Sequence, residues 1–285
     1  MIAAAAARAP GTWGELVQGT VGGVDALITC PVNLHAIAVA RLGSADRWQG
    51  PAGRPRTLRA LAGIPGGGQV RIRSPLRPGA GMASSTADLC AAMAAASALI
   101  GLPKTPEELF DRCRRLEPTD GLMFPGIALV DHVHGSRVEL LGPPPPLGII
   151  GVDAGGVVET GGFNGRADLK EANRRKEPAV REALTTAITA VAAGDAAALA
   201  TAATLSARVH QAILPNPLWE RAAALAPACG ALGVNIAHSG TVVGFLFDLN
   251  RTDMVEEAHW LGPRLGLPVR LLKLISGGIT IHKRG

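Results

Sequence analysis

The chain of 285 residues contains no tyrosine, and aromatic residues make up only 3% of it. Platforms that stack single-stranded nucleic acid need several exposed aromatic rings, so this composition disfavours that class of partner. The net charge of +5 is modest, and a basic run such as 174–176 is typical of a solvated helix face. We therefore expect no nucleic-acid partner, whereas the positive excess suits a small anionic substrate such as a nucleotide.

The sequence also lacks a membrane span and a signal peptide. Residues 1–7 are apolar but too short, with no preceding basic region. The uncharged run 222–247 is interrupted by Pro227, Gly230, Gly233 and Gly240. The four cysteines are widely spaced without a Cys-x-x-Cys pair, which indicates buried thiols in a reducing compartment. These features predict a cytoplasmic protein with no membrane partner.

Two common nucleotide-binding loops are missing. No Gly-x-x-x-x-Gly-Lys-Ser/Thr segment occurs, so the chain has no P-loop. The run from Gly79 to Ser84 lacks the third glycine of the dinucleotide fingerprint. A different glycine-rich turn is present at 78–85, between a strand predicted at 69–74 and an alanine-rich helix that extends to Ile100.

This turn has the composition of an anion-binding loop. Gly79 and Gly81 allow a tight turn and close approach of the backbone to a ligand. Ser85 with Asp88 fits a capping box, which predicts that the helix begins at the serine pair. The unpaired N–H groups at that helix start would then stabilise a phosphate. A serine-capped turn without a ligand is the alternative interpretation, because such turns are common.

The remaining pattern predicts an α+β chain of two domains. We expect strands at 2–9, 24–30 and 33–41, with the first ended by Pro10, and a surface loop or irregular hairpin at 45–65. A capping-box helix should begin at Thr105, and a hairpin should turn at Gly135. The proline run 143–146 is the clearest linker, so we predict domains at 1–146 and 147–285.

Three segments together resemble the GHMP kinases, the superfamily of galactokinase, homoserine kinase and mevalonate kinase. They are Ala-Pro-Gly-Thr-Trp-Gly-Glu at 9–15, Pro-Gly-Ala-Gly-Met-Ala-Ser-Ser at 78–85, and His-Ser-Gly-Thr at 238–241. The middle segment keeps the shape of the family motif Pro-x-x-x-Gly-x-x-Ser-Ser-x-Ala, with one residue fewer between its proline and glycine. The resemblance implies a GHMP kinase fold: an N-terminal domain like ribosomal protein S5 domain 2 and a ferredoxin-like C-terminal domain.

Segments 10–19, 81–88 and 237–244 look like the L-threonine kinase branch of that superfamily, which serves the cobalamin pathway. The resemblance implies ATP and Mg²⁺ as cofactors, L-threonine as the small-molecule substrate, and a product that supplies the aminopropanol linker. Another small hydroxy amino acid, such as serine, homoserine or a derivative, stays open as the acceptor. A catalytically silent nucleotide sensor also stays open, and so does the choice between a monomer and a homodimer.

The resemblance assigns roles to residues of the middle segment and of the turn after the next helix. The loop would wrap the ATP phosphates with Pro78, Gly79, Ala80, Gly81, Met82, Ala83, Ser84 and Ser85. Ser85 would offer a hydroxyl and Glu117 a carboxylate to Mg²⁺. Many relatives carry an Asp eleven residues after this Glu, and Ala128 stands there. We therefore expect the acceptor proton to leave late, largely to phosphate, with Asp120 and Asp131 as candidate bases.

An amino-acid acceptor needs partners for its ammonium and its carboxylate. Glu15 and Gln18 are predicted on the ammonium and hydroxyl side, and Arg166 on the carboxylate side, because a guanidinium binds a carboxylate bidentately. Ser239, Gly240 and Thr241 are expected to close the cleft from the second domain, although the same residues also suit an ordinary turn between strands. A zinc site at His132 and His134 is disfavoured.

Overall fold

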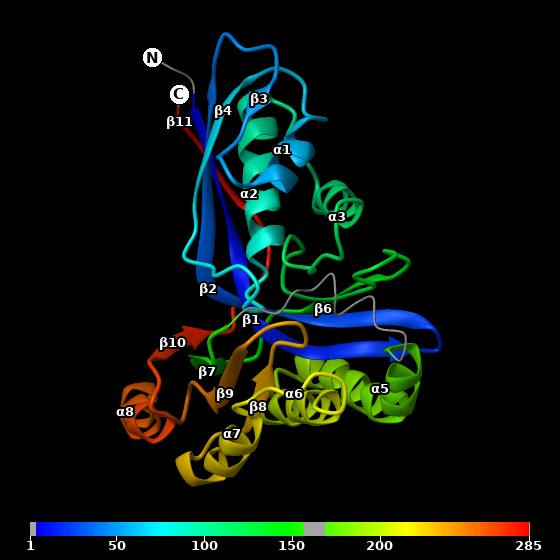
Figure 1. Ribbon diagram of the computed structural model, residues 1–285, viewed down its shortest axis with the longest axis vertical. Helices are drawn as coiled ribbons and strands as arrows, with labels where there is room; N and C mark the ends of the chain where they lie inside the picture. The colour runs from blue at the N-terminus through cyan, green and yellow to red at the C-terminus, as the bar shows by residue number, and fades with distance from the viewer. Residues whose placement is uncertain (1–3, 157–168, 285) are drawn as a thin grey trace.

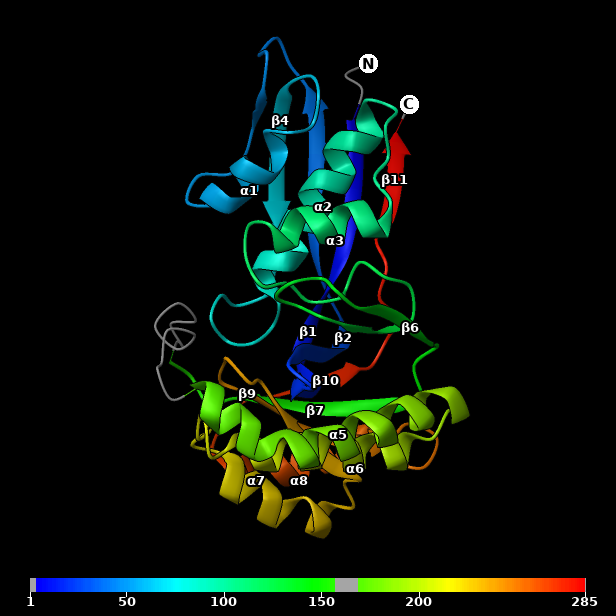
Figure 2. The ribbon, with the colours of Figure 1, turned by 90° about the vertical axis from the view of Figure 1, so that its right-hand side faces the viewer.

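The computed structural model describes residues 4–156 and 169–284. Its N-terminal half is built on two long antiparallel strands, β1 (Ala4–Val21) and β2 (Val24–Leu42). β4 (Gly68–Arg73) pairs with β2, and β3 (Trp48–Gln49) pairs with β4. The last strand, β11 (Thr280–Arg284), pairs with β1, so both ends of the chain lie side by side (Figure 2).

Helix α2 (Ser84–Leu99) packs on this sheet beneath α1 (Pro55–Leu61) and α3 (Pro106–Arg114) (Figure 1). Almost every residue of α2 is buried, as its uniformly apolar sequence requires. The capping box predicted at Thr105 is confirmed, since its hydroxyl accepts from the Glu108 N–H at 3.2 Å. The hairpin predicted around Gly135 is confirmed as β5 (Ile127–Val130) and β6 (Val138–Gly142).

The C-terminal half adds an antiparallel sheet with helices on one side (Figure 2). Its strands are β7 (Leu147–Asp153), β8 (Gly233–Ile236), β9 (Val242–Asp248) and β10 (Val269–Lys273), in the spatial order β10-β7-β9-β8. The helices are α5 (Leu169–Ala193), α6 (Ala196–His210), α7 (Trp219–Leu225), the short 3-10 turn η1 (Pro227–Cys229) and α8 (Met254–Leu265). β8 meets β1 where Ile236 pairs with Glu15, which joins the two halves.

Two local predictions are wrong. β1 does not end at Pro10 but continues to Val21, because register shifts beside Pro10 and Glu15 absorb the irregular residues without ending the pairing. The segment predicted as a loop at 45–65 contains β3 and α1. The buried side chains of α1, Thr57, Ala60 and Leu61, are spaced to face the protein from one helical turn to the next.

The division into domains 1–146 and 147–285 stays a proposal. The proline run lies between β6 and β7, as the prediction requires, yet β11 comes from the second segment and pairs within the first.

In the described ranges, no helix combines the length and the hydropathy needed to cross a membrane. All four cysteines are free and buried.

Candidate active site

Main-chain hydrogen bonds hold the glycine-rich loop at 78–85 between the two other motifs. From β1, the Thr12 N–H donates to the Met82 carbonyl at 3.1 Å, and the Gly14 N–H donates to the Gly81 carbonyl at 3.0 Å. From the opposite side, the N–H groups of Thr241 and Val242 both donate to the Ala80 carbonyl, at 3.0 and 3.1 Å. The loop carbonyls are therefore bound by protein on both sides.

Two glycines make this close approach possible. A Cβ on Gly81 would lie 2.1 Å from the Ala237 Cβ, and the φ of Gly81 is +83°. A Cβ on Gly240 would lie 2.4 Å from the backbone of Ala80. Since real Cβ atoms do not approach other atoms so closely, only glycine fits at these two positions.

The capping box predicted at Ser85 and Asp88 is wrong. Helix α2 does begin at Ser84, but its N-cap is Ala83, which has a φ of +48° and makes no side-chain cap. The Asp88 carboxylate instead forms an ion pair with Arg54 at the start of α1. The first N–H groups of any α-helix have no partner within the helix, and at α2 no side-chain cap binds them either. This favours an anion at this end of α2.

Glu117 lies at this end of α2 as well. Its neighbour Thr119 hydrogen-bonds Thr86 through their hydroxyls at 3.1 Å, which holds the turn after α3 against the first turn of α2. Glu117 Oε2 pairs with Arg56 Nη1 at 2.8 Å, while Oε1 is buried without a hydrogen-bond partner. The helix start and the predicted carboxylate therefore meet at one place.

A magnesium ion on ATP fits these residues. Over residues 4–156 and 169–284, no three His, Cys, Asp or Glu side chains gather as a metal cage. Mg²⁺ in nucleotide sites takes only one or two carboxylates, and phosphate and water oxygens complete its shell. The orphaned Oε1 of Glu117 and the Ser85 hydroxyl at the helix start are suitable oxygen donors, so the magnesium assignment stays a prediction consistent with this geometry.

The two candidate bases have opposite environments. Asp131 is bound in its own turn, where its oxygens accept from the N–H groups of Val133, His134 and Ser136 and from the Ser136 hydroxyl. Burial acts to raise its pKa, but these hydrogen bonds outweigh burial and lower the pKa to about 2. The structure thus gives Asp131 the role of a turn residue and argues against a base.

Asp120 keeps part of its surface exposed. Desolvation, followed by the charges of Glu15 and Glu117, raises its pKa to about 7. Asp120 is therefore close enough to both Glu15 and Glu117 for their charges to act on it. A carboxyl with a pKa near neutrality is suited to proton transfer.

Glu15 belongs to a buried polar network. Its Oε2 accepts from the His238 N–H at 2.7 Å and lies 3.1 Å from His238 Nδ1. The side chain is buried, and burial raises the pKa of Glu15 to about 8, although the His238 N–H and the charge of Lys176 oppose this shift. Gln18 enters the same network, because its N–H donates to the Ser206 hydroxyl, which contacts His238 Nε2. Glu15 and Gln18 therefore lie together, as the prediction requires.

The third motif, residues 238–241, mainly contacts other parts of the protein. The Thr241 hydroxyl donates to Asp153 at 2.7 Å and accepts from Arg77 at 2.8 Å, so it is already engaged with protein. Gly240 lies against the loop backbone, and Ser239 stays partly exposed beside it. The roles of these three residues in substrate binding stay predictions. Arg166 lies outside the described residues.

Sequence reasoning missed Arg54, Arg56 and Lys176. The two arginines fall in the segment predicted as a loop, where nothing indicated that α1 would bring them to carboxylates. Lys176 falls in a basic run interpreted as solvated, but it is only 8% exposed. Its position four residues before the buried Val180 and seven before the buried Ala183 places it on the inner stripe of α5, which a helical projection reveals.

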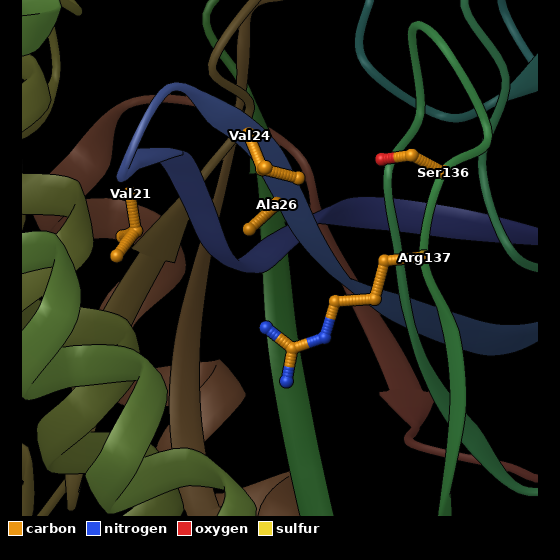
Figure 3. A pocket seen from close by; sticks show the side chains of 5 residues that line it. All are labelled: Val21, Val24, Ala26, Ser136 and Arg137. Carbon is orange, nitrogen blue, oxygen red and sulfur yellow. The ribbon is translucent and has the colours of Figure 1, made fainter.

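Two surface pockets are lined by residues outside the loop at 78–85. One, of about 340 Å³, is lined by Val21, Val24, Ala26, Ser136 and Arg137, and Figure 3 shows the Arg137 side chain extending across it. The other, of about 330 Å³, lies beside Trp13, Arg77 and Asp153. Neither lining includes residues 78–85, so the candidate site rests on its hydrogen-bond geometry.

A glycine-rich loop docked beside an uncapped helix start is suited to binding an anion such as phosphate. The model of the GHMP kinases N terminal domain matches residues 54–125. An L-threonine kinase from Citrobacter freundii is 30% identical over 289 residues, which cover 98% of this chain and 100% of that protein. The chain belongs to the GHMP kinases, as its motifs indicate.

Solved structures agree in fold. The homoserine kinase from Cytophaga hutchinsonii has a TM-score of 0.72 at 16% identity, covering 98% of this chain and 97% of the other. The mevalonate-3-kinase from Thermoplasma acidophilum, solved with mevalonate 3-phosphate and ADP bound, has a TM-score of 0.70 at 11% identity and covers 100% of both chains. The GHMP kinase fold expected from the sequence is confirmed.

We predict that Gly81→Ala disrupts nucleotide binding far more than Gly101→Ala does. Both glycines have positive φ, so each alanine costs about 1–2 kcal/mol of backbone strain. Only at Gly81 would the new methyl group overlap Ala237, since nothing lies within 4 Å of a Cβ at Gly101. Displacing the loop should lower kcat/KM for ATP by about 10²-fold. Equal effects of the two variants on ATP kinetics would contradict the docking role of Gly81.

Proposed function

We propose that this chain transfers the γ-phosphoryl group of ATP to the side-chain hydroxyl of L-threonine, giving O-phospho-L-threonine. The observation that carries the proposal is the 30% identity with the Citrobacter freundii L-threonine kinase across 98% of this chain. A role in supplying the cobalamin aminopropanol linker rests on the resemblance of the three motifs. Four free, buried thiols support the cytoplasmic location expected from cysteine spacing.

Phosphoryl transfer depends on positioning and charge neutralisation more than on covalent chemistry. The N–H groups at the uncapped start of α2 would bind the phosphate oxygens, and the docked loop would keep them in place. Ser85 and the orphaned Oε1 of Glu117 would hold Mg²⁺. When bound, this ion neutralises negative charge on the phosphates. A mevalonate-3-kinase of the same fold was solved with ADP, which supports a nucleotide at this site.

Asp120 is the residue that we propose to accept the hydroxyl proton. Burial raises its pKa to about 7, and the charges of Glu15 and Glu117 add to this shift. This environment favours a protein base over the late loss of the proton to phosphate that the sequence led us to expect. Ala128, where many relatives carry an Asp, cannot serve this role.

The acceptor is tested with purified protein, Mg-ATP and separate L-threonine, L-serine and L-homoserine. We expect ADP release with L-threonine at the highest kcat/KM, and O-phospho-L-threonine by mass spectrometry. A pocket contact with the threonine methyl group is worth about 1–3 kcal/mol, so serine should be about 10- to 200-fold poorer. Higher kcat/KM with another acceptor would replace threonine in the proposal. ADP binding without turnover of any acceptor would favour the nucleotide sensor.

Asp120→Asn should lower kcat by about 10²- to 10⁴-fold while leaving ADP binding intact. Because the pKa of Asp120 is raised to about 7, its carboxyl is protonated below that pH. The kcat/KM of the unchanged enzyme should therefore rise as pH increases through about 7, and the variant should lose this step. Asp131→Asn is the control: it should lower the urea midpoint of unfolding, since it perturbs the turn, and should keep kcat. Wild-type kcat in Asp120→Asn would support proton loss to phosphate.

Glu117→Gln should raise the Mg²⁺ concentration needed for half-maximal activity by about 10- to 100-fold. The amide keeps the size of the side chain but removes the charge that binds a cation. Calorimetry of ADP binding with and without Mg²⁺ gives a second readout, in which the variant should lose the magnesium-dependent gain. Glu107→Gln, on the exposed side of α3, is the matched control. An unchanged magnesium requirement in Glu117→Gln would remove Glu117 from the site.

A further inference from the structure

Lys176 is a buried ammonium without a carboxylate partner. Its Nζ lies 3.3 Å from His210 Nδ1 and 3.4 Å from the Gln18 carbonyl, and the residue is 8% exposed. No carboxylate of the described residues lies within 4.0 Å of it. An ammonium carries three donors, and two long contacts leave one of them unused. Burial lowers the pKa of Lys176 only to about 8, so it stays largely charged at neutral pH.

Two imidazole rings connect this ammonium to Glu15. His210 Nε2 lies 2.7 Å from the His238 carbonyl, which can only accept, so Nε2 carries the proton and Nδ1 faces Lys176 as an acceptor. His238 in turn contacts Glu15 Oε2 through both its N–H and Nδ1. The ring centroids are 4.2 Å apart. Lys176 and Glu15 therefore lie at the two ends of one buried network.

Unsatisfied polar atoms lie in the same network. Gln18, whose carbonyl contacts Lys176, has a buried Oε1 without a hydrogen-bond partner among the described residues. Its Nε2 contacts His132 Nε2 at 3.3 Å, and the Nδ1 of that ring is also buried without a described partner. Buried polar atoms are nearly always paired in proteins. These two unpaired side-chain atoms, in the same network as an ammonium with an unused donor, indicate a ligand that carries both donors and acceptors.

We propose that Lys176 binds the α-carboxylate of the acceptor amino acid, while Glu15 at the other end of the network receives its ammonium group. This inference rests on the proposed function and adds the residue that selects a free carboxylate. The carboxylate of an amino-acid zwitterion complements the charged Lys176. Its ammonium, placed beside Glu15, would favour the ionised form of that carboxyl, whose pKa burial raises to about 8. The site also adjoins the loop at 78–85, which would bind the phosphates. Glu15 follows directly after Gly14, whose N–H donates to the Gly81 carbonyl in that loop.

Steady-state kinetics with L-threonine and L-threoninamide test this assignment. The amide keeps the hydroxyl and the amine but removes the carboxylate charge. In the unchanged enzyme, KM for L-threonine should be about 10- to 100-fold lower than for the amide, as expected for a charge-assisted hydrogen bond. Lys176→Met should raise KM for L-threonine by that factor, leave KM for the amide within about twofold, and change kcat little.

Lys170→Met is the matched control, because it makes the same change at an exposed position of the same helix. It should leave both KM values unchanged. Calorimetric binding of L-threonine in the presence of Mg-ADP should weaken in Lys176→Met alone. Binding of Mg-ADP by itself should stay normal, which shows that the variant is folded.

Three results would overturn the inference. They are equal KM values for L-threonine and its amide in the unchanged enzyme, an unchanged KM for L-threonine in Lys176→Met, or an equal rise for both acceptors in that variant. If Lys176→Met does not fold, Lys176→Gln is measured in the same way, and the comparison in the unchanged enzyme decides by itself. Failure of the proposed function is distinct, because the unchanged enzyme would then phosphorylate neither acceptor.

Discussion

The Ala80 carbonyl is the point on which the candidate site depends. It accepts from Thr241 and Val242, while β1 binds the next two loop carbonyls through Gly14 and Thr12. These bonds use backbone groups only, so they fix the loop path without dictating its side chains. They also require the absence of Cβ atoms at Gly81 and Gly240. Segments at 12–14, 80–82 and 241–242 are thus bound together, and α2 begins directly after the middle one.

Buried charge is the second constraint on the site. Burial raises the pKa of Glu15 to about 8 and that of Asp120 to about 7, and it lowers the pKa of Lys176 to about 8. Each shift reflects that burial disfavours the charged form of the group. A fold selected only for stability would replace such groups with apolar side chains. Their presence beside the glycine-rich loop is consistent with the small, charged acceptor that we propose.

Several elements follow from local sequence, and several do not. Thr105 and Glu108 form the predicted capping box because both partners lie within one helical turn. The same reasoning fails at Ser85 and Asp88, because Arg54 reaches Asp88 from a helix that local pattern did not reveal. Lys176 was interpreted as solvated within a basic run, although its spacing to Val180 places it on the buried stripe. At Asp88 a partner distant in sequence outweighed the local preference, whereas at Lys176 the helical spacing already held the signal.

The sequence by itself determined the family, because three motifs stand in the order and spacing of the GHMP kinases. It also predicted the glycine-rich loop as the place where phosphate would bind. It also determined that Glu15 and Gln18 share one motif. Only the tertiary structure separates the two candidate bases, since Asp131 is bound in its own turn, whereas burial and the charges of Glu15 and Glu117 raise the pKa of Asp120. It alone brought Lys176 of α5 to Gln18 of β1. The physical reason is that burial and charge pairing depend on distances between segments, which a linear pattern does not contain.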